Sequence, residues 1–243
     1  MGINKTVGFV IRSLDYRESD RIVTIFSRDF GKFSGIAKGS RKTDSRFGSS
    51  LDLLNLDEFV FYESETLKFL SEADTLNFFP ELKRSYAKVE RAFQAAKLLD
   101  RATEENHREP ELFFLFNAYL GALERAADQL RSIDLSFKLR LLKGVGLGPR
   151  LDRCAVCGRV LEDEVRFSVE RGGLLGQTCY RGEGVAVEPG VWRSLSQLAE
   201  LPIDRAERIS LGEARSTCET LIDRFIAYHI GWKGGSRADA QKR

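Results

Sequence analysis

Hydrophobic and polar positions roughly alternate along the first 80 residues of the chain. Five short segments there are rich in β-branched and aromatic residues, which predicts strands. The segments are TVGFVIRSL, RIVTIFSR, KFSGIAKG, DEFVFYES and TLKFLSEA. Turn-forming and polar stretches separate them, and the longest of these, residues 39–50, lies between the third and fourth segments. Five strands in this length predict a small barrel or sandwich.

The hydrophobic period changes to that of helices at Pro80. A first predicted helix carries one apolar face: Leu82, Tyr86, Val89, Phe93, Ala96 and Leu99. A second begins near Pro110, and a third runs from about Ser132 to Lys143, where GVGLGP ends it. Near the C-terminus, VWRSLSQLAEL and GEARSTCETLIDRFIAYHIGW also predict helices, the latter burying Leu221, Ile222, Phe225 and Ile226.

The order of these patterns predicts an α+β protein in five parts. Residues 1–80 form a five-stranded barrel, and residues 81–150 form the first part of a helical domain. Residues 151–184 form an insert that carries cysteines and short strands such as VRFSVE. Residues 185–232 complete the helical domain, and residues 233–243 form a flexible tail.

Composition narrows the class of protein. The chain has 243 residues, 42% of them hydrophobic and 30% charged, as in globular proteins. It contains no apolar run of about 18 residues and no signal-peptide core, so we expect a cytoplasmic protein. The formal net charge of +2 does not by itself indicate nucleic-acid binding, so any such indication must be local.

One local cluster of cations follows the third predicted strand. In KGSRKTDSR, the cations Lys38, Arg41, Lys42 and Arg46 face the single acid Asp44. A solvated loop is one interpretation. The other is a phosphate-binding loop on an OB-fold, the five-stranded Greek-key barrel that often binds single strands. The neighbouring Phe33 and Phe47 could stack on bases or belong to the core, and for Phe33 we expect burial.

A second candidate site is the cysteine segment. Cys154 and Cys157 form a Cys-x-x-Cys-Gly turn, and a predicted hairpin brings Cys179 back to them. Gly176 stands where a second Cys-x-x-Cys pair would begin. The site can hold zinc with a fourth ligand from Cys218, His229, Asp152 or water, or the hairpin can stand without metal. For Cys218 itself we expect a small packed residue.

The remaining motifs give no support for an enzyme. The chain has no G-x-x-x-x-G-K-[ST] phosphate loop and no G-x-S-x-G elbow, and GVGLG follows a helix instead of a strand. His107 lies in a polar segment, and for His229 we expect a contact with helix carbonyls or packing against the helical body. We therefore expect no catalytic residues, although a metal-dependent hydrolase with an open metal site is an alternative.

The chain resembles the bacterial DNA repair and recombination family RecO. The resemblance covers YRESDRIVTIFSRDFGKFSGIAKGSRKTDSRFGSSL, FKLRLLKGVGLGPRLDRCAVCG, FSVERGGLL and AYHIG. In the first segment, the matching residues are Tyr16, Glu18, Asp20, Phe26, Gly31, Ala37, Lys38, Gly39, Arg41, Lys42, Ser45 and Gly48. Gly176 departs from the family, whose zinc-bearing members have cysteine there.

The resemblance implies a function and partners. It implies an OB-fold domain, a helical domain and a zinc-ribbon-like insert. The implied activity is to bind single- and double-stranded DNA, to anneal strands and to help RecA replace the single-strand-binding protein SSB. RecR and the acidic C-terminal tail of SSB are the implied partners. Lys138, Arg140 and Lys143 are candidates for binding that tail, or long side chains on a buried helix. The alternative to this function is a protein-interaction module braced by a cysteine hairpin.

Overall fold

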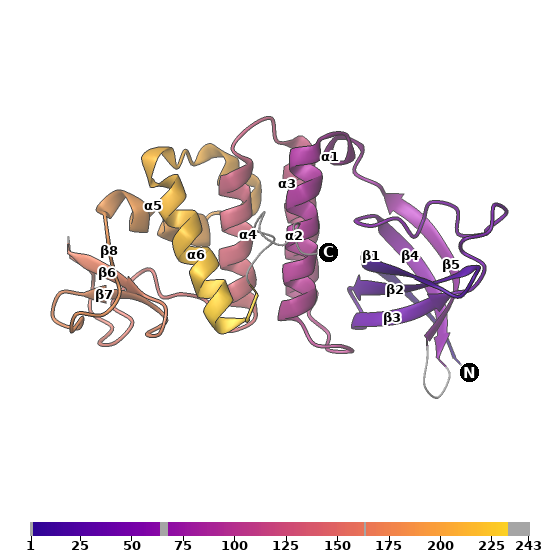
Figure 1. Cartoon of the computed structure of the whole chain (residues 1–243), viewed down its shortest axis with the longest axis horizontal. Helices are drawn as coiled ribbons and strands as arrows, with labels where there is room; N and C mark the ends of the chain where they lie inside the picture. Colours follow the sequence, from indigo (N-terminus) through magenta and orange to yellow (C-terminus); the bar gives the residue numbers. More distant parts are fainter. Residues whose placement is uncertain (1, 64–67, 163, 233–243) are drawn as a thin grey trace. The chain divides into compact units, whose positions relative to one another are not determined.

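The computed structural model describes residues 2–63, 68–162 and 164–232. It divides into two compact units, Met1–Leu120 and Gly121–Arg243. The first unit contains five strands: β1 (Ile3–Tyr16), β2 (Asp20–Ser27), β3 (Gly31–Ala37), β4 (Leu56–Glu63) and β5 (Lys68–Asn77) (Figure 1). They close a barrel in the order β1-β2-β3-β5-β4, with β3 and β5 parallel. The predicted OB-type barrel is confirmed.

The interior of the barrel is filled by alternate residues of its strands. Its buried cluster consists of Val10, Val23, Ile25, Phe33, Ala37, Phe47, Leu51, Phe59, Phe61, Leu70 and Ala73. Phe33 and Phe47 are each only 1% exposed. The suggestion that these two rings stack on bases is therefore wrong, because both are needed to fill the barrel. Phe47 reaches the core from the β3–β4 loop, so the loop is anchored near its middle.

The helices of the first unit correct one expectation. The single helix expected after Pro80 is broken into α1 (Pro80–Arg84) and α2 (Tyr86–Ala102). Ser85 between them is extended, with φ −109° and ψ 114°, so the helical phase restarts after it. Tyr86 consequently lies 81% exposed instead of on the buried face. The helix expected near Pro110 is α3 (Pro110–Arg125).

Aromatic packing and one buried lysine join the barrel to α2 and α3 within the first unit. The Phe9 ring of β1 lies 5.3 Å from that of Phe113 and 5.1 Å from that of Phe116. The ammonium group of Lys32, in β3, donates to the Thr103 carbonyl at 2.7 Å and pairs with the Asp100 carboxylate at 3.0 Å. These contacts leave the opposite side of the barrel free of helices in this unit (Figure 1).

Asp57 of β4 is a fully buried carboxyl group. Burial raises its pKa to about 7, although the nearby Thr75 side chain and the charge of Lys83 act in the opposite direction. In the unfolded chain the same group titrates near 4. Between these two values the folded state retains a proton that the unfolded state has lost, so stability must fall as the pH rises.

We therefore predict that Asp57 lowers the free energy of unfolding by roughly 2–3 kcal/mol as the pH rises from 5 to 7. The Asp57→Asn variant, whose side chain stays neutral, should lack this part of the decline. Urea unfolding of both proteins at pH 5, 6 and 7 measures the difference, in which the contributions of other groups cancel. Parallel curves for the two proteins would contradict the prediction.

In its described residues, the second unit contains the end of α3, three further helices and a small sheet. The helices are α4 (Leu130–Gly144), α5 (Pro189–Glu200) and α6 (Arg215–His229), with short 3₁₀ turns at Ile203–Arg208 and Gly212–Ala214. The sheet has the order β7-β6-β8, formed by β6 (Val165–Ser168), β7 (Gly173–Gly176) and β8 (Val185–Val187) (Figure 1). As expected, α6 buries Leu221, Ile222, Phe225 and Ile226.

Two further expectations concern the C-terminal tail and membrane-spanning helices. The tail expected at 233–243 lies outside the described residues. Among the helices that the structure describes, none has both the length and the apolar content that crossing a membrane requires. The division of the chain into five parts stays a prediction.

Candidate nucleic-acid interface and metal centre

The basic loop, residues 38–46, leaves the barrel at the end of β3. The side chains of Lys38, Arg41, Lys42 and Arg46 are all exposed. Gly39 begins the loop with φ +70°, a conformation that favours glycine, and its N–H donates to the Asp20 carboxylate at 2.9 Å. This hydrogen bond from Gly39 is the largest cause of the lowered pKa of Asp20. The loop is therefore tied to β2 where it begins.

Arg41 joins the basic loop to the β1–β2 turn. Its Nη1 donates to the carbonyl oxygens of Arg17 and Glu18 at 3.1 and 3.2 Å, and its Nη2 lies 3.3 Å from a carboxylate oxygen of Asp15. Arg17 is exposed and has φ +55° in that turn. The structure thus adds Arg17 to the cations beside the loop. The sequence did not indicate Arg17 as a candidate, because the neighbouring acids Glu18 and Asp20 offset its positive charge.

Lys38 and Arg46 lie against β5. The Lys38 Nζ is 4.7 Å from the centroid of the Phe69 ring, and Arg46 Nη2 donates to the Leu70 carbonyl at 3.4 Å. The Arg46 guanidinium also lies 5.1 Å from the Phe47 ring centroid. Within the described residues Lys42 has no ion-pair partner, and its N–H closes a turn onto the Gly39 carbonyl at 3.1 Å. The basic loop is therefore fixed by these contacts while its cations stay exposed.

The three α4 cations do not form one surface. Lys138 pairs with Asp223 of α6 at 2.6 Å, and Lys143 pairs with Glu200 of α5 at 3.2 Å. Arg140 donates to the carbonyl oxygens of Glu200 and Leu201, which end α5. Of the three, only Lys143 lines a pocket of about 320 Å³, whose other lining residues are Leu139, Gly148, Pro149, Arg150, Leu151, Asp152, Ser196, Ala199 and Glu200.

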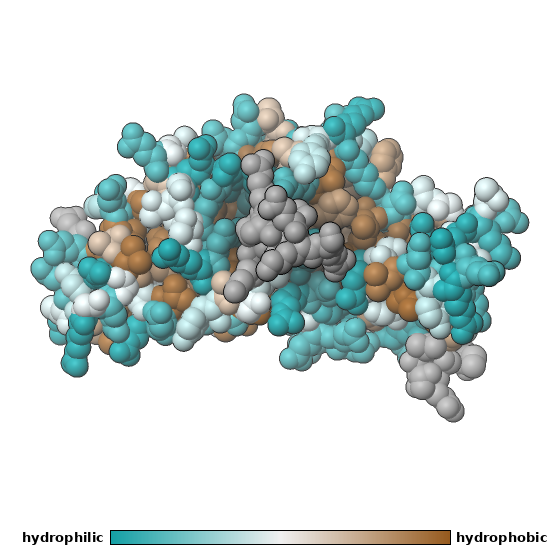
Figure 2. Space-filling view, in the orientation of Figure 1, coloured by the Kyte–Doolittle hydropathy of each residue, from teal (hydrophilic) through white to brown (hydrophobic). Residues whose placement is uncertain are grey.

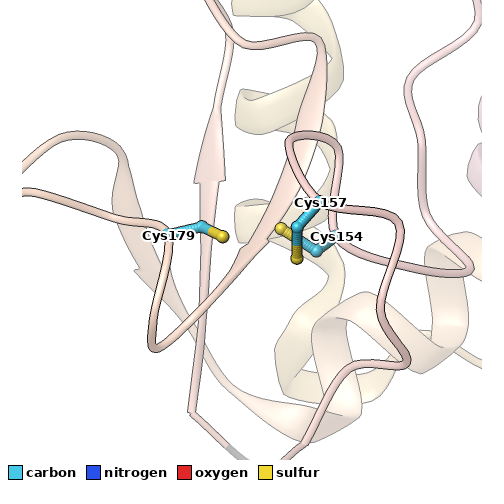
Figure 3. A group of neighbouring side chains, drawn as sticks. All are labelled: Cys154, Cys157 and Cys179. Carbon is cyan, nitrogen blue, oxygen red and sulfur yellow. The ribbon is translucent and has the colours of Figure 1, made fainter.

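The three cysteines of the insert come together as expected. The sulfur atoms of Cys154, Cys157 and Cys179 all lie within 4.8 Å of one another (Figure 3). Cys154 and Cys157 flank a tight turn in which the Gly158 N–H donates to the Cys154 carbonyl at 2.9 Å. Gly158 has φ +73°, which explains the glycine after the second cysteine. Cys179 follows β7, which pairs with β6 in the predicted hairpin.

The surroundings of Cys154 favour its thiolate form. Burial acts to raise its pKa, but the backbone N–H groups of Cys157, Gly176 and Val156 bond to the sulfur and lower the pKa to about 6. A hydrogen bond with Cys157 is the largest cause of the raised pKa of Cys179. A thiolate supported by turn N–H groups is the arrangement that structural zinc sites use. The three cysteines therefore fit a metal ion.

No fourth His, Cys, Asp or Glu ligand joins the cluster among the described residues. Cys218 is buried in α6, where its thiol lies 3.7 Å from the Val191 carbonyl. His229 Nε2 lies 3.0 Å from the Val169 carbonyl, and its ring packs against Phe225 with 4.2 Å between centroids. Asp152 pairs with Arg153 at 2.7 Å. The suggestion that one of these three residues completes the site is wrong, and water is the remaining suggestion.

Gly176 occupies the position of the missing cysteine in a turn, but it provides no sulfur ligand. The Cys179 N–H donates to the Gly176 carbonyl at 2.9 Å, so residues 176–179 form a turn, whereas the turn at Cys154 is closed by the Gly158 N–H. A Cβ atom added to Gly176 would meet only the Leu161 side chain, at 4.0 Å. The backbone here can accept a side chain. The absence of cysteine, and not a distorted backbone, removes the fourth thiolate.

Comparisons with known proteins match the chain along its length. The family model described as Recombination protein O N terminal matches residues 1–79, and Recombination protein O C terminal matches residues 88–238. The DNA repair protein RecO of Rubrobacter xylanophilus is 35% identical over 85% of this chain and 84% of its own length. That of Syntrophus aciditrophicus is 30% identical over 94% of this chain and 91% of its own length. That of Desulfitobacterium hafniense (strain Y51) is 30% identical over 98% of this chain and 90% of its own length.

These descriptions name repair and recombination proteins, and they name no catalysed reaction. The matches cover the barrel, the helices and the cysteine insert, which are the parts described above. The chain belongs to the RecO family of DNA repair proteins.

Proposed function

We propose that the protein is a recombination mediator that binds single- and double-stranded DNA, anneals complementary strands and assists RecA on SSB-coated DNA. The observation that carries this proposal is the exposed basic loop on the rim of an OB-type barrel, with Lys38, Arg41, Lys42 and Arg46 in it and Arg17 beside it. Family membership supports a DNA repair role.

The charge of the loop accounts for annealing. Two strands that approach each other repel through their phosphates, and cations that replace condensed counterions reduce this repulsion. Because the loop is anchored by Gly39 at one end and Phe47 at the other, its cations are held on one side of the barrel. A strand bound there offers its bases to a complementary strand. No bond is made or broken, so the proposed activity requires no catalytic group.

Annealing of SSB-coated complementary oligonucleotides tests this function. We expect the protein to accelerate duplex formation by roughly tenfold or more at low salt, and the acceleration to disappear near 0.5 M salt, where phosphate contacts weaken steeply. The readout is quenching of a donor–acceptor dye pair as the strands meet. Reactions with the protein omitted give the baseline. Rates equal to that baseline at low salt would reject the mediator function.

We further propose that Cys154, Cys157 and Cys179 hold zinc as a structural ion, with water as the fourth ligand. The support is the convergence of three sulfur atoms and the thiolate-stabilising N–H groups around Cys154. When bound, zinc would cross-link the turn at 154–157 to the end of the β6–β7 hairpin. In this role the three cysteines would stabilise the second unit.

The acidic tail of SSB is the proposed ligand of the pocket beside α4. Lys143 and Arg150 supply positive charge at this pocket, where Glu200 and Asp152 also lie, and Leu139, Pro149 and Leu151 supply apolar lining. This is the chemistry that receives an apolar, acidic peptide end. Lys138 and Arg140 do not line the pocket, so we assign them to holding α6 and the end of α5 in place. RecR as a partner and a nucleoid-associated, cytoplasmic location stay predictions from the resemblance.

A further inference from the structure

An uninterrupted row of apolar side chains crosses the outside of the barrel. The ladder pairs Leu14 with Ile22, Ile22 with Ile36, Ile36 with Phe69, and Phe69 with Tyr62. Cross-strand partners lie side by side, so these five residues, here called the apolar row, follow one line over β1, β2, β3, β5 and β4. Four steps between strands give the row a length of about 19 Å.

The apolar row faces away from the barrel interior. Successive residues of a strand point to opposite faces, and the neighbours Val23, Ala37, Phe61 and Leu70 all belong to the buried core. The row consequently lies on the outer face: Leu14 is 53% exposed, Ile22, Tyr62 and Phe69 are half-buried, and Ile36 in the middle of the row is 7% exposed. Figure 2 shows hydrophobic residues reaching the surface of the barrel among hydrophilic ones. An outward apolar line of this length is not needed to fill the core.

Aromatic rings and cations lie at both ends of the row. The Tyr62 and Phe69 rings are stacked, with 5.5 Å between centroids and 20° between planes, and the Lys38 ammonium group lies 4.7 Å from the Phe69 ring. At the other end, Leu14 is two residues from Tyr16, whose ring lies beneath the exposed Arg17. The row therefore runs from the β1–β2 turn to the end of β4 and the start of β5, and the basic loop begins beside it.

Flat aromatic surface edged by cations is complementary to an unpaired strand. Exposed bases stack on aromatic rings, while the phosphates between them seek positive charge. A duplex offers the same phosphates, but its bases are stacked on each other and closed to the row. The observed mixture of rings and cations thus matches a single strand better than a duplex.

We propose that the apolar row is a base-stacking platform that makes the barrel bind unpaired strands more tightly than duplex, so that the annealed product leaves. This inference rests on the proposed DNA-binding function. While strands are single, the rings and the loop cations both contribute to binding. Once the strands pair, the ring contacts are lost and only the phosphate contacts remain. The row therefore drives release of the duplex after annealing.

The test replaces both rings while keeping apolar volume, in the Tyr62→Leu/Phe69→Leu variant. Three probes are used: a short oligothymidylate, a strand of equal length made of abasic nucleotides, and a duplex. We expect the wild-type protein to bind oligothymidylate roughly tenfold or more tightly than the abasic strand, since stacking contributes on this scale. The variant should bind these two strands equally, with unchanged duplex affinity and salt dependence. Circular dichroism and thermal melting verify that it is folded.

The matched control is Tyr86→Leu, which removes an aromatic ring that is 81% exposed on α2, away from the row. It should leave the preference for bases intact. A ring variant that keeps its preference for oligothymidylate, or that loses duplex affinity equally, would overturn the stacking platform. Alanine at Lys38, Arg41, Lys42 and Arg46 tests the loop separately. If this change spares all three affinities while the ring variant loses its preference, the loop assignment fails and the platform stands.

Discussion

Replacement of Lys38, Arg41, Lys42 and Arg46 by alanine is expected to weaken single-strand binding by roughly a hundredfold to a thousandfold at 0.1 M salt. Each cation that neutralises a phosphate of a single strand contributes about −0.7 to the slope of log affinity against log salt concentration. Four such contacts correspond to a slope contribution of roughly −3. Fluorescence anisotropy with a labelled oligonucleotide, titrated at several salt concentrations, measures affinity and slope together.

The loop's own structure makes its four cations unequal. Arg41 already binds the carbonyl oxygens of Arg17 and Glu18, whereas Lys42 makes no ion pair within the described residues. The single change Lys42→Ala should therefore reduce the slope by close to a full contact without disturbing the loop. Arg41→Ala should also loosen the β1–β2 turn. A charge-matched control is alanine at four exposed cations outside the loop, Lys97, Arg101, Arg205 and Arg208.

This control separates a local site from a general effect of charge. Both quadruple variants lose the same number of positive charges, so a purely diffuse attraction would weaken both equally. We expect the control to retain affinity within about threefold. If the loop variant binds with wild-type affinity and an unchanged slope, the loop is not the DNA-binding site. If the two variants lose affinity equally, net charge and not the loop is responsible.

The barrel was predictable because its signals are local. Alternation in segments such as RIVTIFSR shows which residues face inward, and Val23 and Ile25 are indeed buried. The apolar row was not predictable, because it depends on register. Phe69 meets Ile36 through a parallel pairing of β3 and β5, and nothing near either residue in the sequence indicates that pairing. Arg17 was missed because Glu18 and Asp20 offset its charge in the sequence, and only the fold brings it to Arg41.

The cysteine site shows the same boundary between local and non-local information. The Cys154–Cys157 turn follows from its spacing, and Gly172 and Gly173 correctly indicate the hairpin that returns Cys179. The fourth ligand could not be derived in this way. Cys218 and His229 are suitable residue types, but in α6 the Cys218 thiol contacts the Val191 carbonyl and the His229 ring contacts the Val169 carbonyl. Which side chains are already engaged is decided by packing, which spacing does not encode.

The Gly176→Cys change is expected to complete a four-thiolate site and to tighten zinc binding by several hundredfold. Structural zinc sites contribute about 10–16 kcal/mol from four ligands, so one ligand corresponds to roughly 2.5–4 kcal/mol. The turn at 176–179 is already formed, and an added Cβ meets only Leu161 at 4.0 Å. Little of this gain should therefore be lost to rearrangement. Competition with a chromophoric chelator measures zinc affinity, and cobalt substitution reports tetrahedral thiolate coordination.

The matched control is Gly190→Cys, which adds a thiol in the first turn of α5, where a Cβ meets nothing within 4 Å. It should leave zinc affinity unchanged, because residue 190 is not part of the three-cysteine cluster. Cys179→Ser should lower affinity in both the wild-type and the Gly176→Cys backgrounds. Equal zinc affinity in the Gly176→Cys and Gly190→Cys proteins would mean that residue 176 does not reach the metal. In that case the metal would connect the β6–β7 hairpin to the Cys154–Cys157 turn through Cys179 alone, beside the backbone hydrogen bond from the Ala155 N–H to the Leu174 carbonyl.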